Sequence, residues 1–243
     1  MIFEGLFDNF FKTDIPGEVY SSLIVMVIVM ILSIIIGIKA HFQDPLKRPK
    51  GLLLITEEGV KFFDNLTREY VGDALPNMGG FIMGVAVYLF IAFIFGLTGL
   101  PSPVTYMSIP LSLGLTAFLA IHLTSARFTK WKYFKRYVDP FPVFLPVNLI
   151  SMWAPLLSLS LRLFGNAIAG ALLMQLLYGA FASVGDSIIT FASGDELTAG
   201  SFIAPLITPL LHAYFDLFSG FIQVTVFISL TSIFVGQEIP HEE

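Results

Sequence analysis

The sequence contains no cysteine and few charged residues. Both shortages exclude certain kinds of site and certain classes of protein. Without cysteine the chain forms no disulfides and no thiolate metal sites, and its four histidines lack a ligand spacing such as HExxH. Only 13% of the 243 residues are charged and 56% are hydrophobic, a balance too apolar for a water-soluble domain. The alternating pattern of an outer-membrane barrel is also missing. The composition therefore predicts an all-α membrane protein.

Several apolar runs are long enough to cross a membrane, which takes about 20 residues in a helix. The acidic, aromatic arm at 1–19 precedes them and lacks the basic segment and cleavage site of a signal peptide. Residues 55–72 instead have apolar side chains on one helical face and charged side chains elsewhere, which is typical of a helix at the membrane interface. We expect a single polytopic membrane domain over 1–243, with an outer N-terminal arm (1–19), a first span (20–38), an interfacial amphipathic helix (55–72), a transmembrane hairpin (78–126) and two long tilted, membrane-parallel helices (142–182 and 202–235).

The basic residues are distributed unevenly, and their distribution predicts the orientation. Cytoplasmic loops collect lysine and arginine, so the N-terminus is expected outside and the C-terminus in the cytoplasm. The stretch 183–201 has acidic residues but no lysine or arginine, and we expect it to be an outer loop between the two long helices. Eleven of the thirteen basic residues lie on the predicted inner side, six before the hairpin (Lys39, Lys47, Arg48, Lys50, Lys61, Arg68) and five after it (Arg127, Lys130, Lys132, Lys135, Arg136).

Arg162 lies inside an apolar stretch, where a charge costs a few kcal/mol or more. One interpretation is an arginine near a helix end whose side chain reaches the membrane surface. However, Arg162 has apolar residues on both sides. Arginine stays protonated in proteins, whereas buried lysine readily loses its charge. We therefore favour a functional site that needs a fixed positive charge.

Small residues surround Asn166, which shares a helical face with Arg162 one turn away. Gly165, Ala169 and Gly170 would let another helix approach closely. They could pack against helices of the same chain. Together with Arg162, they favour a partner helix with an acidic side chain.

The last long helix carries a second polar set, at the spacing of one helical stripe. It consists of His212, Asp216, Ser219 or Gly220, and Gln223. A single histidine or glutamine on an apolar helix usually serves packing, but four such positions favour a hydrated path. Asp216 is the one acidic residue between 202 and 235 and is thus the expected proton acceptor.

A third set of polar residues lies before Arg162 in the chain, and it is a weaker indication of a water-filled path. Serines in membrane helices often bond to their own backbone, so a second water-filled path is only one of two interpretations. The set comprises Asn148, Ser151, Ser158 and Ser160.

The stretch SLSLRLFGNAIAG at 158–170 resembles the signature of subunit a of the F-type ATP synthase, the stator protein beside the rotating c-ring. The order of elements is similar over nearly the whole chain, including DPLKRPKG, GLPSP and a final helix with Gln223. The resemblance implies a subunit of the bacterial cell membrane that is not catalytic alone. It implies coupling of proton flow to rotation and ATP synthesis, with the c-ring, the peripheral-stalk b subunits and membrane lipid as partners. No cofactor, metal or nucleic acid is implied.

The resemblance also implies roles for single residues. Arg162 matches the arginine that attracts a c-subunit carboxylate and separates two proton half-channels. Asn166 and Gln223 match polar residues of the access path near that arginine. Ser158 resembles a position on the opposite half-channel.

This chain departs from the common bacterial pattern at two positions. Many bacterial relatives have glutamate where this chain has Ala171, and histidine where it has Asp216. The carboxyl has thus moved to the last helix, as in mitochondrial relatives. We expect Asp216 to be the inlet group and His212 to be its helper.

Two other functions compete with this interpretation. A secondary transporter could use Arg162 and Asp216 as a switching pair, although the repeated halves and broken helices of that class are not evident. A structural scaffold would use Arg162 only for packing. Transport by the purified chain alone would favour the transporter, and unimpaired ATP synthesis after Arg162→Ala would favour the scaffold.

Overall fold

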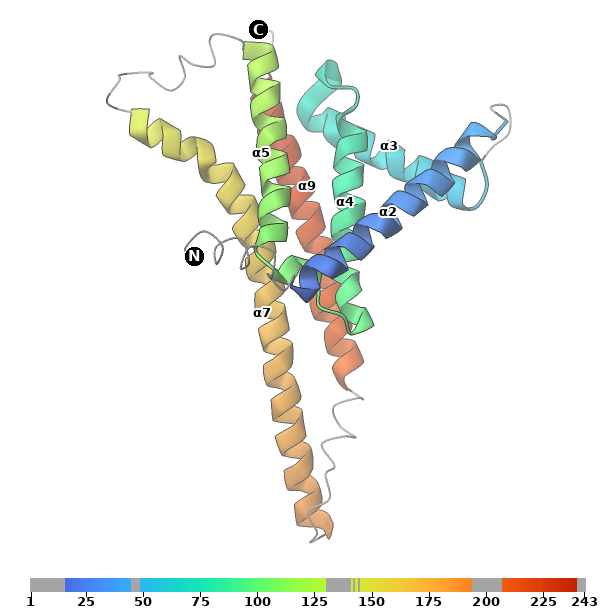
Figure 1. Cartoon of the computed structure of the whole chain (residues 1–243), viewed down its shortest axis with the longest axis vertical. Coiled ribbons are helices and arrows are strands. Elements are labelled where there is room, and N and C mark those ends of the chain that lie inside the picture. The colour runs from blue at the N-terminus through green and yellow to red at the C-terminus, as the bar shows by residue number, and fades with distance from the viewer. Residues whose placement is uncertain are drawn as a thin grey trace, which may run out of the picture.

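The computed structural model describes residues 16–44, 49–129, 141, 143, 145–193 and 207–239. Within these ranges the chain is helical and contains no strand, which confirms the predicted all-α class. Most of the N-terminal arm, residues 194–206 of the expected outer loop and last helix, and the tail from 240 lie outside them. The long helices are α2 (Gly17–His41), α3 (Leu52–Val71), α4 (Met78–Phe95), α5 (Ser108–Thr129), α7 (Leu145–Ser193) and α9 (Ser219–Gln237) (Figure 1).

Five helical segments of the described chain are long and apolar enough to cross a membrane: Gly17–His41, Met78–Thr98, Ser108–Thr129, Leu145–Val184 and Ile207–Gln237. They differ in how much of their surface the protein covers. In the most apolar 18-residue window, 44% of Ile207–Gln237 is buried but only 6% of Leu145–Val184. The last helix and α5, which has the same buried share, are therefore the most covered of the five segments, whereas α7 leaves most of its surface to lipid or to partners.

Helix α7 is longer than the sequence analysis predicted. We expected a loop from 183 onward, but the helix continues to Ser193 and extends beyond the other helices (Figure 1). A glycine inside a helix costs only about 1 kcal/mol relative to alanine, so Gly185 need not end it. The tilt of α7 relative to a membrane stays a prediction.

Helix α3 is bounded by two glycines that take backbone conformations unfavourable for other residues. Gly51 has φ +62° and Gly72 has φ +65°, in the region where a Cβ is disfavoured. Between them, Lys61 and Glu57 form an exposed ion pair of 2.7 Å at i,i+4 spacing. The hydrogen bond and the charge of Glu57 raise the pKa of Lys61. This polar face fits the predicted interfacial helix.

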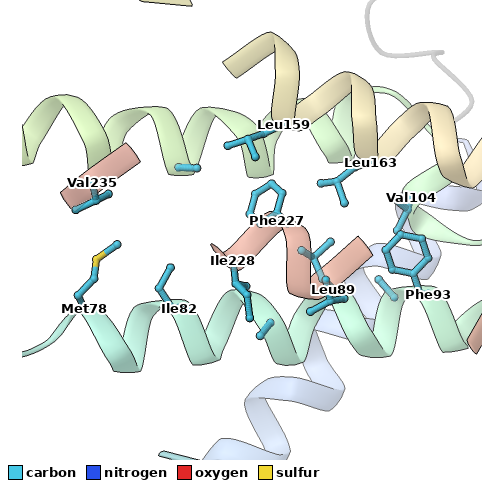
Figure 2. Close-up of a cluster of buried hydrophobic side chains, with 14 of the residues drawn as sticks. Met78, Ile82, Leu89, Phe93, Val104, Leu159, Leu163, Phe227, Ile228 and Val235 are labelled. Carbon is cyan, nitrogen blue, oxygen red and sulfur yellow. The ribbon is translucent and has the colours of Figure 1, made fainter. Parts of the chain in front are cut away.

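The core forms where α9 packs between α4 and α5 (Figure 2). The expected hairpin of α4 and α5 thus has the last helix between its two arms. Helix α7 closes this core from the side of α5 with Leu159 and Leu163, which are 1% and 0% exposed. The buried residues from the other helices include Met78, Ile82, Leu89, Phe93, Phe227, Ile228 and Val235.

Glycines allow the helices to approach closely. A Cβ on Gly220 would come within 2.9 Å of the Phe93 Cβ, so α9 lies almost against α4 there. A Cβ on Gly236 would overlap the backbone carbonyl oxygen of Tyr70 on α3. A serine side chain, Ser160 of α7, occupies the space that a Cβ on Gly114 of α5 would need. These contacts fix α9 and α7 relative to the rest.

Candidate functional site

A cavity of about 370 Å³ lies between α7, the start of the last helix and the turn that joins α4 to α5. Helix α4 and the turn contribute Phe93, Gly96, Leu100, Pro101, Ser102 and Thr105. Helix α7 contributes Asn166, Ala167, Gly170, Ala171, Met174, Gln175 and Tyr178. The last helix contributes His212, Phe215, Asp216 and Ser219.

Helix α7 supplies one continuous face of this cavity. Its lining residues follow one another at alternating spacings of one and three, so each has another lining residue three or four positions away, on the same side of the helix. Asn166 lies at one end of this face and Tyr178 at the other, twelve positions apart. At about 1.5 Å per residue, this stretch of helix is about 18 Å long.

The opposite wall is a π-helical segment, Ala213–Phe218, which directly follows the helical residues 207–212. A π-helix has a wider turn than an α-helix and often occurs at functional sites. Here it follows His212 and contains Asp216, and His212 Nδ1 contacts the Asp216 carboxylate. The other ring nitrogen of His212, Nε2, is 2.5 Å from the hydroxyl of Tyr178. Both side chains are about one quarter exposed, at 29% for His212 and 25% for Asp216.

The π-helical segment divides the single polar stripe that the sequence predicted. His212, Asp216 and Ser219 line the cavity. Gly220 packs on Phe93, and Gln223 lies in the core at 3% exposure. The stripe assumed 3.6 residues per turn throughout, and the wider turn changes the helical phase after residue 213.

Gln223 remains connected to the cavity through Asn166. The Asn166 amide Nδ2 donates a hydrogen bond of 2.6 Å to Gln223 Oε1. The Gln223 amide nitrogen has no partner among the described residues and is buried. Such a buried donor is normally satisfied by a water molecule or a ligand. The structure thus brings together four predicted residues, Asn166, Gln223, His212 and Asp216.

Arg162 lies on a different side of α7 from the core. It is exposed, whereas Leu159 and Leu163 beside it are buried. Within the part of the chain that the structure describes, the guanidinium forms no ion pair or hydrogen bond. Asp216 contacts His212 instead of Arg162. The positively charged guanidinium of Arg162 is therefore available to pair with an acidic group from outside the described chain.

The small residues near Arg162 have different surroundings. A Cβ on Gly165 would meet nothing within 4 Å, and Ala169 is exposed. These two positions leave room beside Arg162. Gly170 instead lines the cavity. That these residues face a c-ring stays a prediction.

In the third polar set, Ser160 does not share a side of α7 with Ser158, and a path through Asn148, Ser151 and Ser158 stays a prediction. Ser158 is exposed, whereas Ser160 is fully buried against Gly114. Residues two apart in an α-helix lie on nearly opposite sides, so these serines cannot line one channel. Ser158, like Arg162, points outward.

Sequence reasoning missed four polar residues of the cavity: Ser102, Thr105, Gln175 and Tyr178. Gln175 and Tyr178 follow Ala171 at i+4 and i+7, so helical spacing alone could have indicated them. Ser102 and Thr105 come from a turn, where no periodicity applies. Across the described residues, no three histidine or acidic side chains gather as metal ligands would.

Comparison with known proteins gives consistent matches over most of the chain. A family model described as ATP synthase A chain matches residues 19–236. The chain is similar to ATP synthase subunit a of Mycoplasma pneumoniae, with 27% identity over 94% of this chain and 82% of that protein. It is also similar to proteins of the same name from Mycoplasmoides gallisepticum (29% identity; 93% and 80% covered) and Pediococcus pentosaceus (27%; 99% and 97%).

Proposed function

The chain belongs to the ATP synthase A chain family, and from this membership we propose that it is the stator subunit of an F-type ATP synthase that guides protons to a rotating c-ring. It makes and breaks no covalent bonds of a substrate. Its role is to couple the passage of protons to rotation and so to ATP synthesis. It acts within a complex that also contains the peripheral-stalk b subunits.

The observation that supports this proposal best is the exposed Arg162, which has no partner among the described residues. A cation on an apolar membrane helix needs a counter-charge, water or a protein interior. The space beside Gly165 lets a neighbouring helix come close. The partner is a c-subunit carboxylate, which is ionised as it passes Arg162.

The cavity is the inlet of this proton path. A proton from the outer side reaches Asp216 and His212, then passes Asn166 and Gln223 and neutralises the c-ring carboxylate. A neutral carboxyl enters lipid at much lower cost than a charged one. After nearly a full turn, the carboxyl loses its proton to the cytoplasmic side, near Ser158.

Arg162 prevents protons from passing directly between the two half-channels, because its fixed positive charge repels them. Direction comes from the membrane potential, which contributes about 2.3 kcal/mol per charge per 100 mV. In this arrangement the protein is a multi-pass protein of the bacterial cell membrane. Its N-terminus lies outside and its C-terminus lies in the cytoplasm.

The test is to replace Arg162 by alanine in the intact ATP synthase and to measure ATP synthesis driven by an imposed proton gradient in vesicles. We expect no synthesis, although the complex assembles. The matched control is Arg127→Ala, at the end of α5, where the guanidinium lies 6.0 Å from the Phe128 ring. Synthesis at the normal rate by Arg162→Ala would contradict the proposal.

A further inference from the structure

Three titratable side chains form a continuous chain of contacts across the cavity. Tyr178 of α7 contacts His212 Nε2 through its hydroxyl, and His212 Nδ1 contacts the Asp216 carboxylate. Of the residues that line the cavity, these three are the titratable ones. Tyr178 is 40% exposed, whereas His212 and Asp216 are half-buried, so Tyr178 is the most exposed residue of the three.

The chemistry of these groups fixes the hydrogen positions for an ionised Asp216. A carboxylate can only accept, so Nδ1 of His212 must carry the hydrogen that it donates. In a neutral ring Nε2 is then an acceptor, and the Tyr178 hydroxyl donates to it. All three groups are satisfied, and each hydrogen points toward Asp216.

A protonated Asp216 is satisfied by the same contacts with every hydrogen bond reversed. The acid then donates to Nδ1, and Nε2–H donates to the Tyr178 oxygen. The two arrangements differ by one proton, and the heavy atoms keep their places. This is the property of a proton relay, in which histidine accepts on one ring nitrogen and donates from the other.

We propose that Tyr178 and His212 relay protons from the outer end of the cavity to Asp216. This inference rests on the proposed function and adds Tyr178 to the path. In the step, a proton from external water binds the Tyr178 oxygen as the Tyr178 O–H proton passes to His212 Nε2. The Nδ1 proton of His212 passes to Asp216. One proton enters, one carboxyl group becomes neutral, and Tyr178 keeps a hydroxyl hydrogen.

The test replaces Tyr178 by phenylalanine in the intact ATP synthase, with gradient-driven ATP synthesis in vesicles as the readout. We expect a loss of about tenfold or more, since a positioned proton-transfer group typically contributes 10²–10⁴. Tyr178→His should restore part of the rate, because imidazole can also accept and donate a proton. The matched control is Tyr214→Phe, on the π-helical segment, where the residue is 57% exposed and its ring stacks on Phe218.

The variants separate a relay from a purely structural contact. A normal rate in Tyr178→Phe would overturn the relay, and it would leave the proposed function intact if Arg162→Ala still abolished synthesis. If Tyr178→Phe does not assemble, Tyr178→Gln replaces it: its amide can bond to His212 but does not pass protons, so the same loss is expected. A normal rate in assembled Tyr178→Gln would equally overturn the relay.

Discussion

Asn166 and Gln223 join α7 to α9 by a hydrogen bond of 2.6 Å, although they are 57 positions apart in the chain. This bond and the contact between Tyr178 and His212 lie at the two ends of the same cavity. From the first contact to the second, the position along α7 rises from Asn166 to Tyr178, whereas the position along the last helix falls from Gln223 to His212. The two helices therefore run antiparallel along the cavity.

The first prediction concerns the stability of this pair. Asn166→Ala leaves the carbonyl of the buried Gln223 unpaired, which costs about 1–3 kcal/mol. Adding Gln223→Leu removes the unpaired groups and should recover much of this loss, because an apolar replacement of similar shape is nearly neutral. Unfolding of the detergent-solubilised variants measures both effects. Equal or greater destabilisation in the double variant would contradict the pairing.

The second prediction concerns the carboxyl group of the cavity. Asp216→Asn should lower gradient-driven ATP synthesis by about tenfold or more, because the amide cannot accept a proton as the carboxylate does. Ala171→Glu should partly rescue this variant, since Ala171 and Asp216 line the same cavity.

The control for the rescue by Ala171→Glu introduces a glutamate outside the cavity. Leu172 follows Ala171 on α7 but is 55% exposed and is not part of the cavity lining. Leu172→Glu should therefore fail to rescue Asp216→Asn. An unchanged synthesis rate in Asp216→Asn alone would remove Asp216 from the path.

The third prediction concerns the contact between α5 and α7. A Cβ on Gly114 would overlap Ser160 Oγ and approach the Leu156 carbonyl oxygen to 3.1 Å. Overpacking of this kind typically costs about 1–3 kcal/mol, so Gly114→Ala should lower the thermal stability of the complex. Ser160→Ala should relieve part of the overlap.

A matched glycine is available on the neighbouring helix. A Cβ on Gly84 of α4 would meet nothing within 4 Å, so Gly84→Ala should leave stability unchanged or raise it slightly. If Gly114→Ala and Gly84→Ala behaved alike, the close approach of α5 and α7 at Ser160 would be wrong.

The fourth prediction concerns Gly236, where α9 meets the backbone of α3. A Cβ there would overlap the Tyr70 carbonyl oxygen, which cannot move aside as a flexible side chain can. Gly236→Ala should therefore destabilise the complex or prevent its assembly. Gly37→Ala on α2, where nothing lies within 4 Å of the added atom, is the control. Normal assembly and stability of Gly236→Ala would contradict this packing.

The all-helical class could be predicted because it depends only on the length and apolarity of single runs. Those properties are local, and the described chain confirms them. The end of α7 could not be predicted from Gly185 and the acidic residues near it, since a long helix tolerates such residues. The position of α9 between α4 and α5 depends on contacts between distant segments, which no local pattern encodes.

The site was only partly predictable for a related reason. Asp216 and Arg162 were apparent because charges are rare in apolar helices. The role of Tyr178 was not apparent, because a tyrosine in a membrane helix is unremarkable until a histidine from another helix meets it. The six-residue π-helical segment also breaks the 3.6-residue period on which the stripe from His212 to Gln223 was based.

The outward position of Arg162 has a consequence for the life of the subunit before it joins a complex. A newly inserted copy holds this cation on an apolar helix of which little is covered by its own chain. Insertion scales put the cost of such a charge at the bilayer centre at about 2.5–3.5 kcal/mol. The solitary subunit therefore bears this cost, and the ring carboxylate that we propose as the partner of Arg162 would relieve it.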